Sequence, residues 1–332
     1  MIIDSKNCCF YNEYNLKNCS FRCNIRNTHF LRGIMMENTI RSLYGPYFKQ
    51  LAENSVAAAK IDATNVYQPA NTKNRGLIDK LVSDNILPES HIGSEENFLD
   101  FYNQVKEGKS GLILMEHFAN TDLPALMYLL DHNGKPELAD LSKRIVAIAG
   151  MKLNEDDNIV RAFAESFTRV VIYPTRSLDK NAQKVSEEEA KEEEMKARKI
   201  NLAAMKAMDE CKRRGEVILV FPSGTRYRPG HPETKRGLRE IDSYLRLFDI
   251  AILVSINGSI LKIQDGKEDM LSDIVCKDKL VFTASPVIQC KQFRKDYLAT
   301  LPADDTDPKQ KVIDRVMQIL EEQHDEVEKT RL

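Results

Sequence analysis

Short apolar runs alternate with stretches of helical spacing along the chain from Gly111 onward. The apolar runs predict buried strands and lie near Leu112, Ile145, Val171, Val217, Ile252 and Val281. Strands that alternate with helical patterns are typical of an α/β layer, in which helices cover a parallel or mixed sheet. We therefore expect residues 106–332 to form an α/β domain with a mixed or mainly parallel central sheet flanked by helices.

Residues 35–105 show helical spacing without this alternation. The segment 36–59 predicts a helix with a break near Gly45 and Pro46. Two further helices are predicted at Asn74–Ser83 and Glu95–Lys106. We interpret the whole region as a small helical N-terminal part that leads into the α/β domain.

Residues 1–34 are rich in Asn and Cys and lack the continuous apolar core of a secretory signal. We expect this segment to be disordered or to precede the true start of the protein, because Met35 and Met36 open a clean helical pattern. A metal site built from its cysteines and His29 fits no familiar zinc spacing. The seven cysteines of the chain are odd in number and scattered, which favours a reducing compartment over a disulfide framework.

Composition and charge narrow the classes of partner. With 332 residues and 42% hydrophobic content the chain can bury a sizeable core. The net charge of -2 and the pI near 6.4 argue against a nucleic-acid partner. Because no apolar stretch approaches the length of a membrane-spanning helix, we expect a cytoplasmic protein whose membrane contact is limited to the inner face.

The first candidate for chemistry is the segment Glu116–Asp122, which joins a predicted strand to a predicted helix at Asp122–Leu130. His117 and Asp122 are five positions apart, so they meet only if the turn folds the carboxylate back toward the imidazole. A carboxylate on one ring nitrogen fixes the tautomer and leaves the other nitrogen to take a proton from an alcohol. The alternative is that His117 is a turn histidine and Asp122 a charge in the first helical turn.

The second candidate is the segment Phe221–Gly230, which follows a predicted strand. Its first part is a turn made of Pro222, Ser223, Gly224 and Thr225. Beyond the turn, Arg226 and Arg228 face one way if the segment is extended, and a guanidinium pair suits a phosphate dianion. The carboxyl end of a strand is where α/β proteins collect ligands, although ordinary loop charges are the alternative.

The H-x-x-x-x-D box followed by a P-x-G-T-R box resembles the glycerolipid acyltransferases. The stretch Pro222–Pro229 is most similar to the P-S-G-G-R-x-R-P loop of the soluble glycerol-3-phosphate acyltransferases of plastids and some bacteria. The likeness runs from about Gly111 to Ile260. It implies transfer of an acyl group from acyl-CoA or acyl carrier protein, as co-substrate, to the 1-hydroxyl of glycerol 3-phosphate, with no further cofactor and no metal.

Three departures from the family pattern bear on the acceptor. Glu116 stands where the plastid enzymes usually have asparagine, and the strand Ala251–Asn257 lacks the usual proline. The stretch that supplies further basic residues in those enzymes contains one here, Arg176. The resemblance therefore implies that Arg176, Arg226 and Arg228 hold the acceptor phosphate.

Other charged segments carry weaker signals. Lys235 and Arg236 are candidates for binding phosphates of the acyl donor, with surface charge as the alternative. Asp179–Arg214 is a charged stretch whose second half has an apolar stripe that includes Leu202 and Met205. The segment Lys311–Lys329 predicts an amphipathic helix that docks on the main domain.

We expect a direct ternary mechanism, in which His117 removes the proton of the acceptor hydroxyl as that oxygen attacks the thioester. A nucleophilic serine is the competing route, but Ser110 and Ser223 lie in no G-x-S-x-G elbow. Two other functions stay open: acylation of lysophosphatidate, and non-catalytic phosphate binding by the same fold.

Overall fold

The computed structural model describes residues 38–155, 157–174, 186–264 and 269–331, which lie in one compact unit. Residues 1–34, for which disorder is predicted, and Arg176 lie outside the described residues. The strands of the main sheet are β1 Tyr67–Gln68, β2 His91–Gly93, β3 Gly111–Met115, β4 Ile145–Gly150, β5 Arg169–Ile172, β6 Val217–Val220, β7 Ile250–Asn257, β10 Val281–Ala284 and β11 Ile288–Gln289. A small second sheet pairs β8 Leu261–Lys262 with β9 Ile274–Val275.

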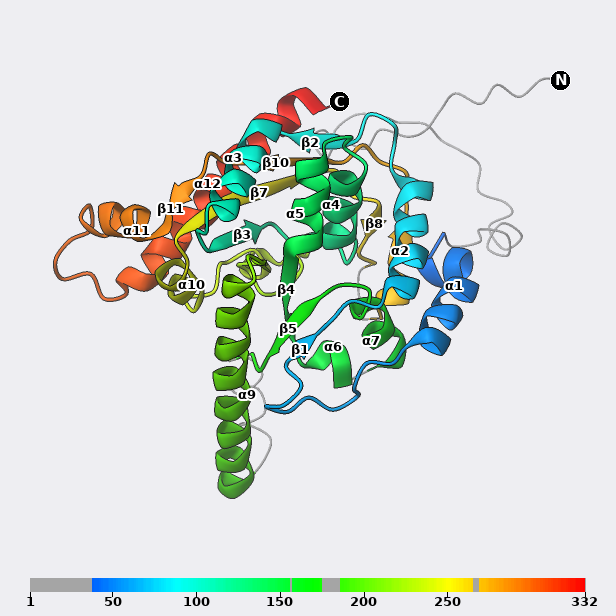
Figure 1. The fold of residues 1–332 in the computed structure, drawn as a ribbon, viewed down its shortest axis with the longest axis horizontal. Coiled ribbons are helices and arrows are strands. Elements are labelled where there is room, and N and C mark those ends of the chain that lie inside the picture. Colours follow the sequence, from blue (N-terminus) through cyan, green and yellow to red (C-terminus); the bar gives the residue numbers. More distant parts are fainter. Residues whose placement is uncertain (1–37, 156, 175–185, 265–268, 332) are drawn as a thin grey trace, which may run out of the picture. The chain divides into compact units, whose positions relative to one another are not determined.

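Within these residues the main sheet has nine strands in the order β1-β5-β4-β6-β3-β7-β10-β2, and β11 pairs with β7 (Figure 1). The central run from β5 to β7 is parallel throughout, and β2 is parallel to β10. The antiparallel pairs involve β1, β10 and β11. All six predicted strands are present, and the predicted α/β class with a mainly parallel sheet is confirmed.

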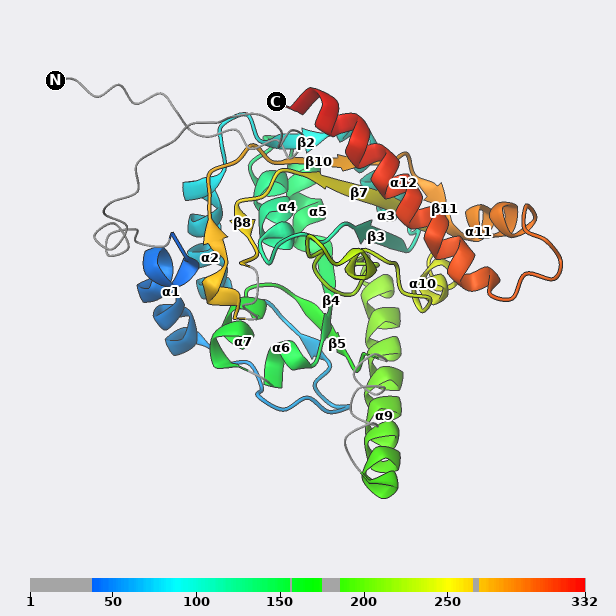
Figure 2. The same cartoon turned by 180° about the vertical axis from the view of Figure 1, so that it is seen from behind.

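Helices cover both faces of the sheet (Figures 1 and 2). They are α1 Ile40–Asn54, α2 Thr72–Asn85, α3 Glu95–Lys106, α4 Asp122–Asp131, α5 Pro136–Arg144, α6 Lys152–Glu155, α7 Asn158–Ala164, α9 Glu187–Arg213, α10 Ile241–Leu247, α11 Cys290–Leu298 and α12 Pro308–Arg331. In β3, Ile113 faces the layer that contains α1 to α5, and Leu114 faces the layer that contains α9, α10 and α12. Every position of β3 and β7 is buried, as expected for strands covered on both sides.

The N-terminal region differs from the prediction at one helix. The predicted break at Gly45 and Pro46 is wrong, because α1 continues through Pro46. Its buried residues, Ile40, Tyr44, Phe48 and Leu51, recur at helical spacing, and this packing outweighs the hydrogen bond that a proline removes. Helices α2 and α3 confirm the two helices predicted next.

The region before residue 106 also supplies β1 and β2, which the sequence pattern does not reveal. Each is only two or three residues long, too short for a period to show. Both strands pair with the main sheet. The division at residue 105 stays a prediction.

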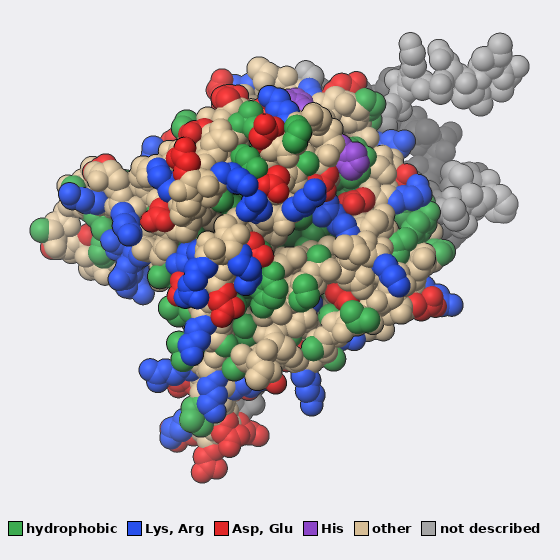
Figure 3. All heavy atoms as spheres, viewed as in Figure 1, with side chains coloured by type: hydrophobic (Ala, Val, Ile, Leu, Met, Phe, Trp, Pro, Cys, Tyr) green, Lys and Arg blue, Asp and Glu red, His purple; other side chains and the backbone are tan. Residues whose placement is uncertain are grey.

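Helix α9 carries the charged stretch. It starts with a capping box at Ser186, and acidic residues fill its first turn. Figure 3 shows acidic side chains at the projecting tip of this helix. The predicted apolar stripe is only partly buried: Ile200 and Met208 face the core, but Leu202 and Met205 are 55% and 49% exposed. No described helix is long and apolar enough to cross a bilayer.

Candidate active site

A tight turn between β3 and α4 joins His117 to Asp122. The Asp122 carboxylate contacts His117 Nδ1 at 2.9 Å through Oδ2. The same oxygen accepts hydrogen bonds from the backbone N–H groups of Phe118 and Ala119, at 2.6 and 2.9 Å. The turn thus folds the carboxylate back onto the imidazole, as the spacing predicts.

The dyad is shielded and held in one orientation. The side chain of Asp122 is 5% exposed and that of His117 is 17% exposed. The imidazole stacks on Phe221, with ring centroids 3.8 Å apart and planes 15° apart. With Nδ1 engaged by a carboxylate, Nε2 is the ring nitrogen available to a reacting group.

His117 opens onto a small pocket in which the two candidate segments meet. The pocket is lined by Glu116, His117, Phe118, Pro222, Ser223, Tyr227, Lys235 and Met317. The backbone N–H of Tyr227 donates to the carbonyl oxygen of His117 at 2.7 Å, so the arginine loop is tied directly to the dyad. The structure thereby brings together two boxes that are distant in sequence.

The turn Pro222–Thr225 packs closely against Leu238. Gly224 has φ +64, a left-handed backbone conformation that favours glycine, and a Cβ there would also displace the end of the Leu238 side chain, 2.5 Å away. The buried Ser223 hydroxyl donates to the carbonyl oxygen of Thr225 at 2.7 Å. Ser110 lies at the opposite end of β3 from His117, where its hydroxyl donates to Asp249 at 2.7 Å. Both hydroxyls thus have structural hydrogen bonds.

The two arginines of the loop have different surroundings. Arg226 Nη1 contacts Asp273 Oδ2 at 2.5 Å, and these side chains are only 13% and 2% exposed. Burial raises the pKa of Asp273, although the charges of Arg226 and Arg228 act to lower it. Arg226 contacts this carboxylate directly, whereas Arg228 acts on it only through its charge.

Arg228 is half-buried, and in the described part of the chain its guanidinium has no acidic partner. Its backbone is fixed instead. The N–H of Arg228 donates to Thr234 Oγ1 at 2.9 Å, and its carbonyl accepts from the N–H of His231 at 2.9 Å. A fixed backbone with an uncommitted guanidinium is suited to bind an anion.

The next two basic residues along the chain, Lys235 and Arg236, lie in different surface depressions. Lys235 lines the pocket, lies 5.8 Å from the centroid of the Tyr227 ring and pairs with Glu321 at 2.8 Å. Arg236 instead lines a separate surface depression together with Asp304, Asp305, Asp307 and Asp314. The structure thus brings Lys235 to the dyad but not Arg236.

Two site residues have no clear sequence signal. Glu116 Oε2 accepts from the backbone N–H of Ile256 at 2.9 Å and contacts His324 Nδ1 at 3.0 Å. Burial by itself lowers the pKa of His324, but the hydrogen bond and charge of Glu116 raise it above the ordinary value. These partners are 208 positions apart, so no spacing rule could pair them.

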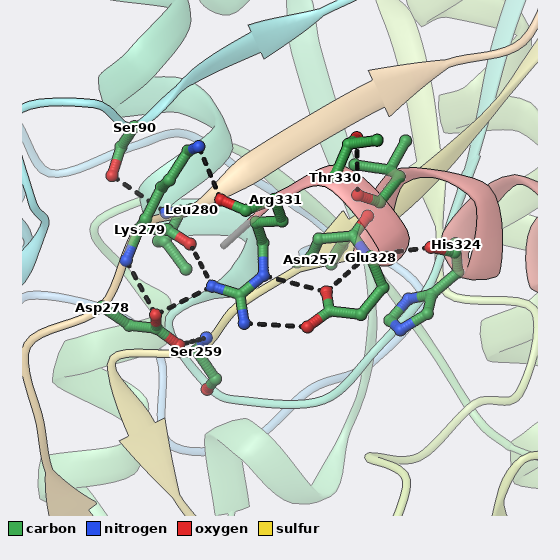
Figure 4. Close-up of polar contacts among 12 residues, drawn as sticks. Ser90, Asn257, Ser259, Asp278, Lys279, Leu280, His324, Glu328, Thr330 and Arg331 are labelled. Carbon is green, nitrogen blue, oxygen red and sulfur yellow. Dashed lines mark hydrogen bonds and ion pairs between the residues drawn. The ribbon is translucent and has the colours of Figure 1, made fainter. Parts of the chain in front are cut away.

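A polar network holds the end of α12, and with it His324, against β7 (Figure 4). Asn257 Nδ2 donates to the carbonyl oxygen of His324 at 3.0 Å and to Glu328 Oε2 at 2.9 Å. Arg331 joins Glu328 to Asp278, with contacts of 2.9 Å to each. Met317 of α12 lines the pocket, and His324 of the same helix contacts Glu116, which also lines it.

A His–Asp dyad with a buried carboxylate and a partly accessible imidazole, at the carboxyl end of a central strand and beside a basic loop, is a site suited to activating a hydroxyl next to an anion. Residues 98–254 match the family model described as Acyltransferase. This span contains both the dyad and the arginine loop, and the match supports acyl transfer in general as the class of reaction. No curated protein compared with the chain matches it.

Proposed function

We propose that the protein is an O-acyltransferase that moves a fatty acyl group from acyl-CoA or acyl carrier protein to the 1-hydroxyl of glycerol 3-phosphate, in phospholipid biosynthesis. The observation that carries the proposal is the His117–Asp122 contact of 2.9 Å at a pocket shared with the arginine loop. The loop likeness to soluble glycerol-3-phosphate acyltransferases supports this acceptor.

The chemical step uses His117 as general base. Nε2 takes the proton of the acceptor hydroxyl while its oxygen attacks the thioester carbonyl, forming the new C–O bond. The tetrahedral intermediate collapses, the C–S bond breaks, and the proton on His117 passes to the leaving thiolate to give a free thiol. Asp122 stabilises the imidazolium that exists between these two proton transfers.

Arg228 is the main phosphate ligand in this proposal, because its guanidinium has no acidic partner among the described residues. Arg226 contributes the N–H groups that Asp273 leaves unused. Arg176 is proposed as a third ligand on the resemblance alone. Holding the phosphate places the hydroxyl at His117, which supplies the entropic part of the rate enhancement.

Lys235 is proposed to contact the acyl donor, since it lines the pocket beside His117. Arg236 is a weaker candidate for contact with the acyl donor, because it lies in a separate depression that is lined by aspartates. The turn amides of Phe118 and Ala119 donate to Asp122, so other groups must stabilise the oxyanion. Cytoplasmic location and contact with the inner face of a membrane stay predictions.

The test is release of free thiol from a long-chain acyl-CoA, with glycerol 3-phosphate or 1-acyl-glycerol 3-phosphate offered separately. Release that depends on glycerol 3-phosphate is the expected result. Release with the lysolipid alone would reassign the enzyme to lysophosphatidate. Release with neither acceptor, and with acyl carrier protein as donor also inactive, would favour a phosphate-binding protein.

A further inference from the structure

Glu116, which lines the same pocket as His117, has a carboxylate oxygen without a hydrogen-bond partner in the described structure. Its side chain is 3% exposed, and Oε1 has no hydrogen-bond partner among the described residues. A buried carboxylate oxygen without a donor is costly in free energy. Because Glu116 lines the same pocket as His117, a ligand in that pocket can supply the missing donor.

The other oxygen of Glu116 fixes the direction in which Oε1 is presented. Oε2 is held by the backbone N–H of Ile256 and by His324 Nδ1, at 2.9 and 3.0 Å. The network around Asn257 in turn holds the backbone of His324 (Figure 4). Oε1 is therefore a preorganised acceptor rather than the end of a mobile side chain.

The chemistry of this oxygen restricts what it can bind. A carboxylate oxygen accepts hydrogen bonds and repels phosphate, so the phosphate of an acceptor belongs at the arginine loop. A hydroxyl group is the donor that a glycerol-based acceptor offers. Its two hydroxyls are on adjacent carbons, so one of them at His117 leaves the other inside the pocket that Glu116 also lines.

We propose that Glu116 recognises the second hydroxyl of the acceptor, so that the pocket selects a phosphorylated vicinal diol over an acceptor that lacks this group. This inference rests on the proposed function and identifies the acceptor group that the site recognises. His324, which contacts Oε2 of the same carboxylate, offsets its charge when the ring is protonated, and this lets an anionic acceptor approach. Glu116 contacts substrate but transfers no proton.

A purely structural role for Glu116, joining β7 to α12, is the competing explanation. Glu116→Gln separates the two roles. The amide oxygen must face the N–H of Ile256, because an NH₂ group there would oppose another donor. The NH₂ group then replaces Oε1 at the pocket, so the variant keeps the bond to the strand and loses the acceptor.

The experiment compares glycerol 3-phosphate with 3-hydroxypropyl phosphate, which lacks the second hydroxyl, using thiol release from long-chain acyl-CoA. The wild type should prefer glycerol 3-phosphate in kcat/KM by about 10- to 100-fold. In Glu116→Gln this preference should fall close to unity, because the value for glycerol 3-phosphate drops and that for the analogue does not. His324→Gln, which alters the other carboxylate oxygen, should keep the preference.

Equal loss for both acceptors in Glu116→Gln would overturn the inference in favour of the structural role, and so would no change for either. If the variant does not fold, the wild type alone decides, since equal turnover of both acceptors would rule out recognition of the second hydroxyl. A wild type that uses neither acceptor but acylates the lysolipid would reject the proposed function, and the inference with it.

Discussion

The two halves of the pocket are assembled in different ways. Every contact described for the Asp122 carboxylate comes from residues 117–119, inside a single turn. The recognition half depends on distant partners, since Arg226 pairs with Asp273, and Lys235 pairs with Glu321. The proton-transfer chemistry is thus encoded locally, whereas the recognition surface exists only once α12 and the segment around Asp273 have packed. Substitutions should therefore affect activity alone in the first half and stability or binding in the second.

The largest effect on activity is expected for His117→Ala. Loss of the general base should lower kcat by about 10²- to 10⁴-fold. The melting temperature should stay near that of the wild type, because the imidazole packs against Phe221 at a partly accessible site. His132→Ala is the matched control, since that exposed histidine ends α4, and its ring contacts in the described structure are a hydrogen bond to the carbonyl of Tyr128 and stacking on the Tyr128 ring. Full activity of the His117 variant would show that another group takes the proton.

Arg226→Ala should have the largest effect on stability. It leaves the carboxylate of Asp273, which is 2% exposed, without its ion-pair partner. Removing one member of a buried pair costs about 3–5 kcal/mol in the free energy of unfolding. Urea denaturation measures the loss of unfolding free energy. Arg41→Ala is the control, because the side chains of the Arg41–Asp269 pair are 64% and 51% exposed and the pair should contribute less than about 1 kcal/mol. Equal losses in the two variants would mean that burial does not distinguish these pairs.

Arg228→Ala should weaken acceptor binding without destabilising the fold. Its guanidinium has no acidic partner within the described ranges, so its loss leaves no buried charge behind. If it holds the acceptor phosphate, KM for glycerol 3-phosphate should rise by about 10- to 100-fold at nearly constant melting temperature. Arg228→Lys should recover only part of the affinity, since it loses the bidentate geometry. An unchanged KM would remove Arg228 from the phosphate site.

The same contrast explains what the sequence predicts and what it misses. The strand before His117 and the dyad are readable because apolar runs and the return of Asp122 within one turn are local patterns. The ion pair of Arg226 with Asp273 and the contact of Glu116 with His324 join residues that are distant in sequence. They depend on tertiary packing, so no periodicity or spacing in the sequence predicts them. Similarly, Leu202 and Met205 fit a helical stripe, yet only the packing of α9 on the sheet decides that they are exposed. Lys235 and Arg236 are adjacent, and the fold alone separates them.

The smallest predicted effect is a pH-dependent contribution of His324 to stability. Burial acts to lower the pKa of His324, but the hydrogen bond and charge of Glu116, with help from Glu328, raise it, and Lys235 opposes them weakly. A folded-state pKa above the unfolded value of about 6.5 means that the contribution is fully present below that pH. It is lost as the pH rises through the folded-state pKa.

The difference in unfolding free energy between the wild type and His324→Gln should therefore be larger at about pH 5 than at about pH 9. Urea denaturation of both proteins at each pH measures it. His132→Gln is the control, because that histidine is exposed and has no carboxylate partner in the described structure. A gap that widens as the pH rises would contradict the raised pKa of His324 and would mean that Glu116 does not hold its proton, so that His324 does not offset the charge of this carboxylate.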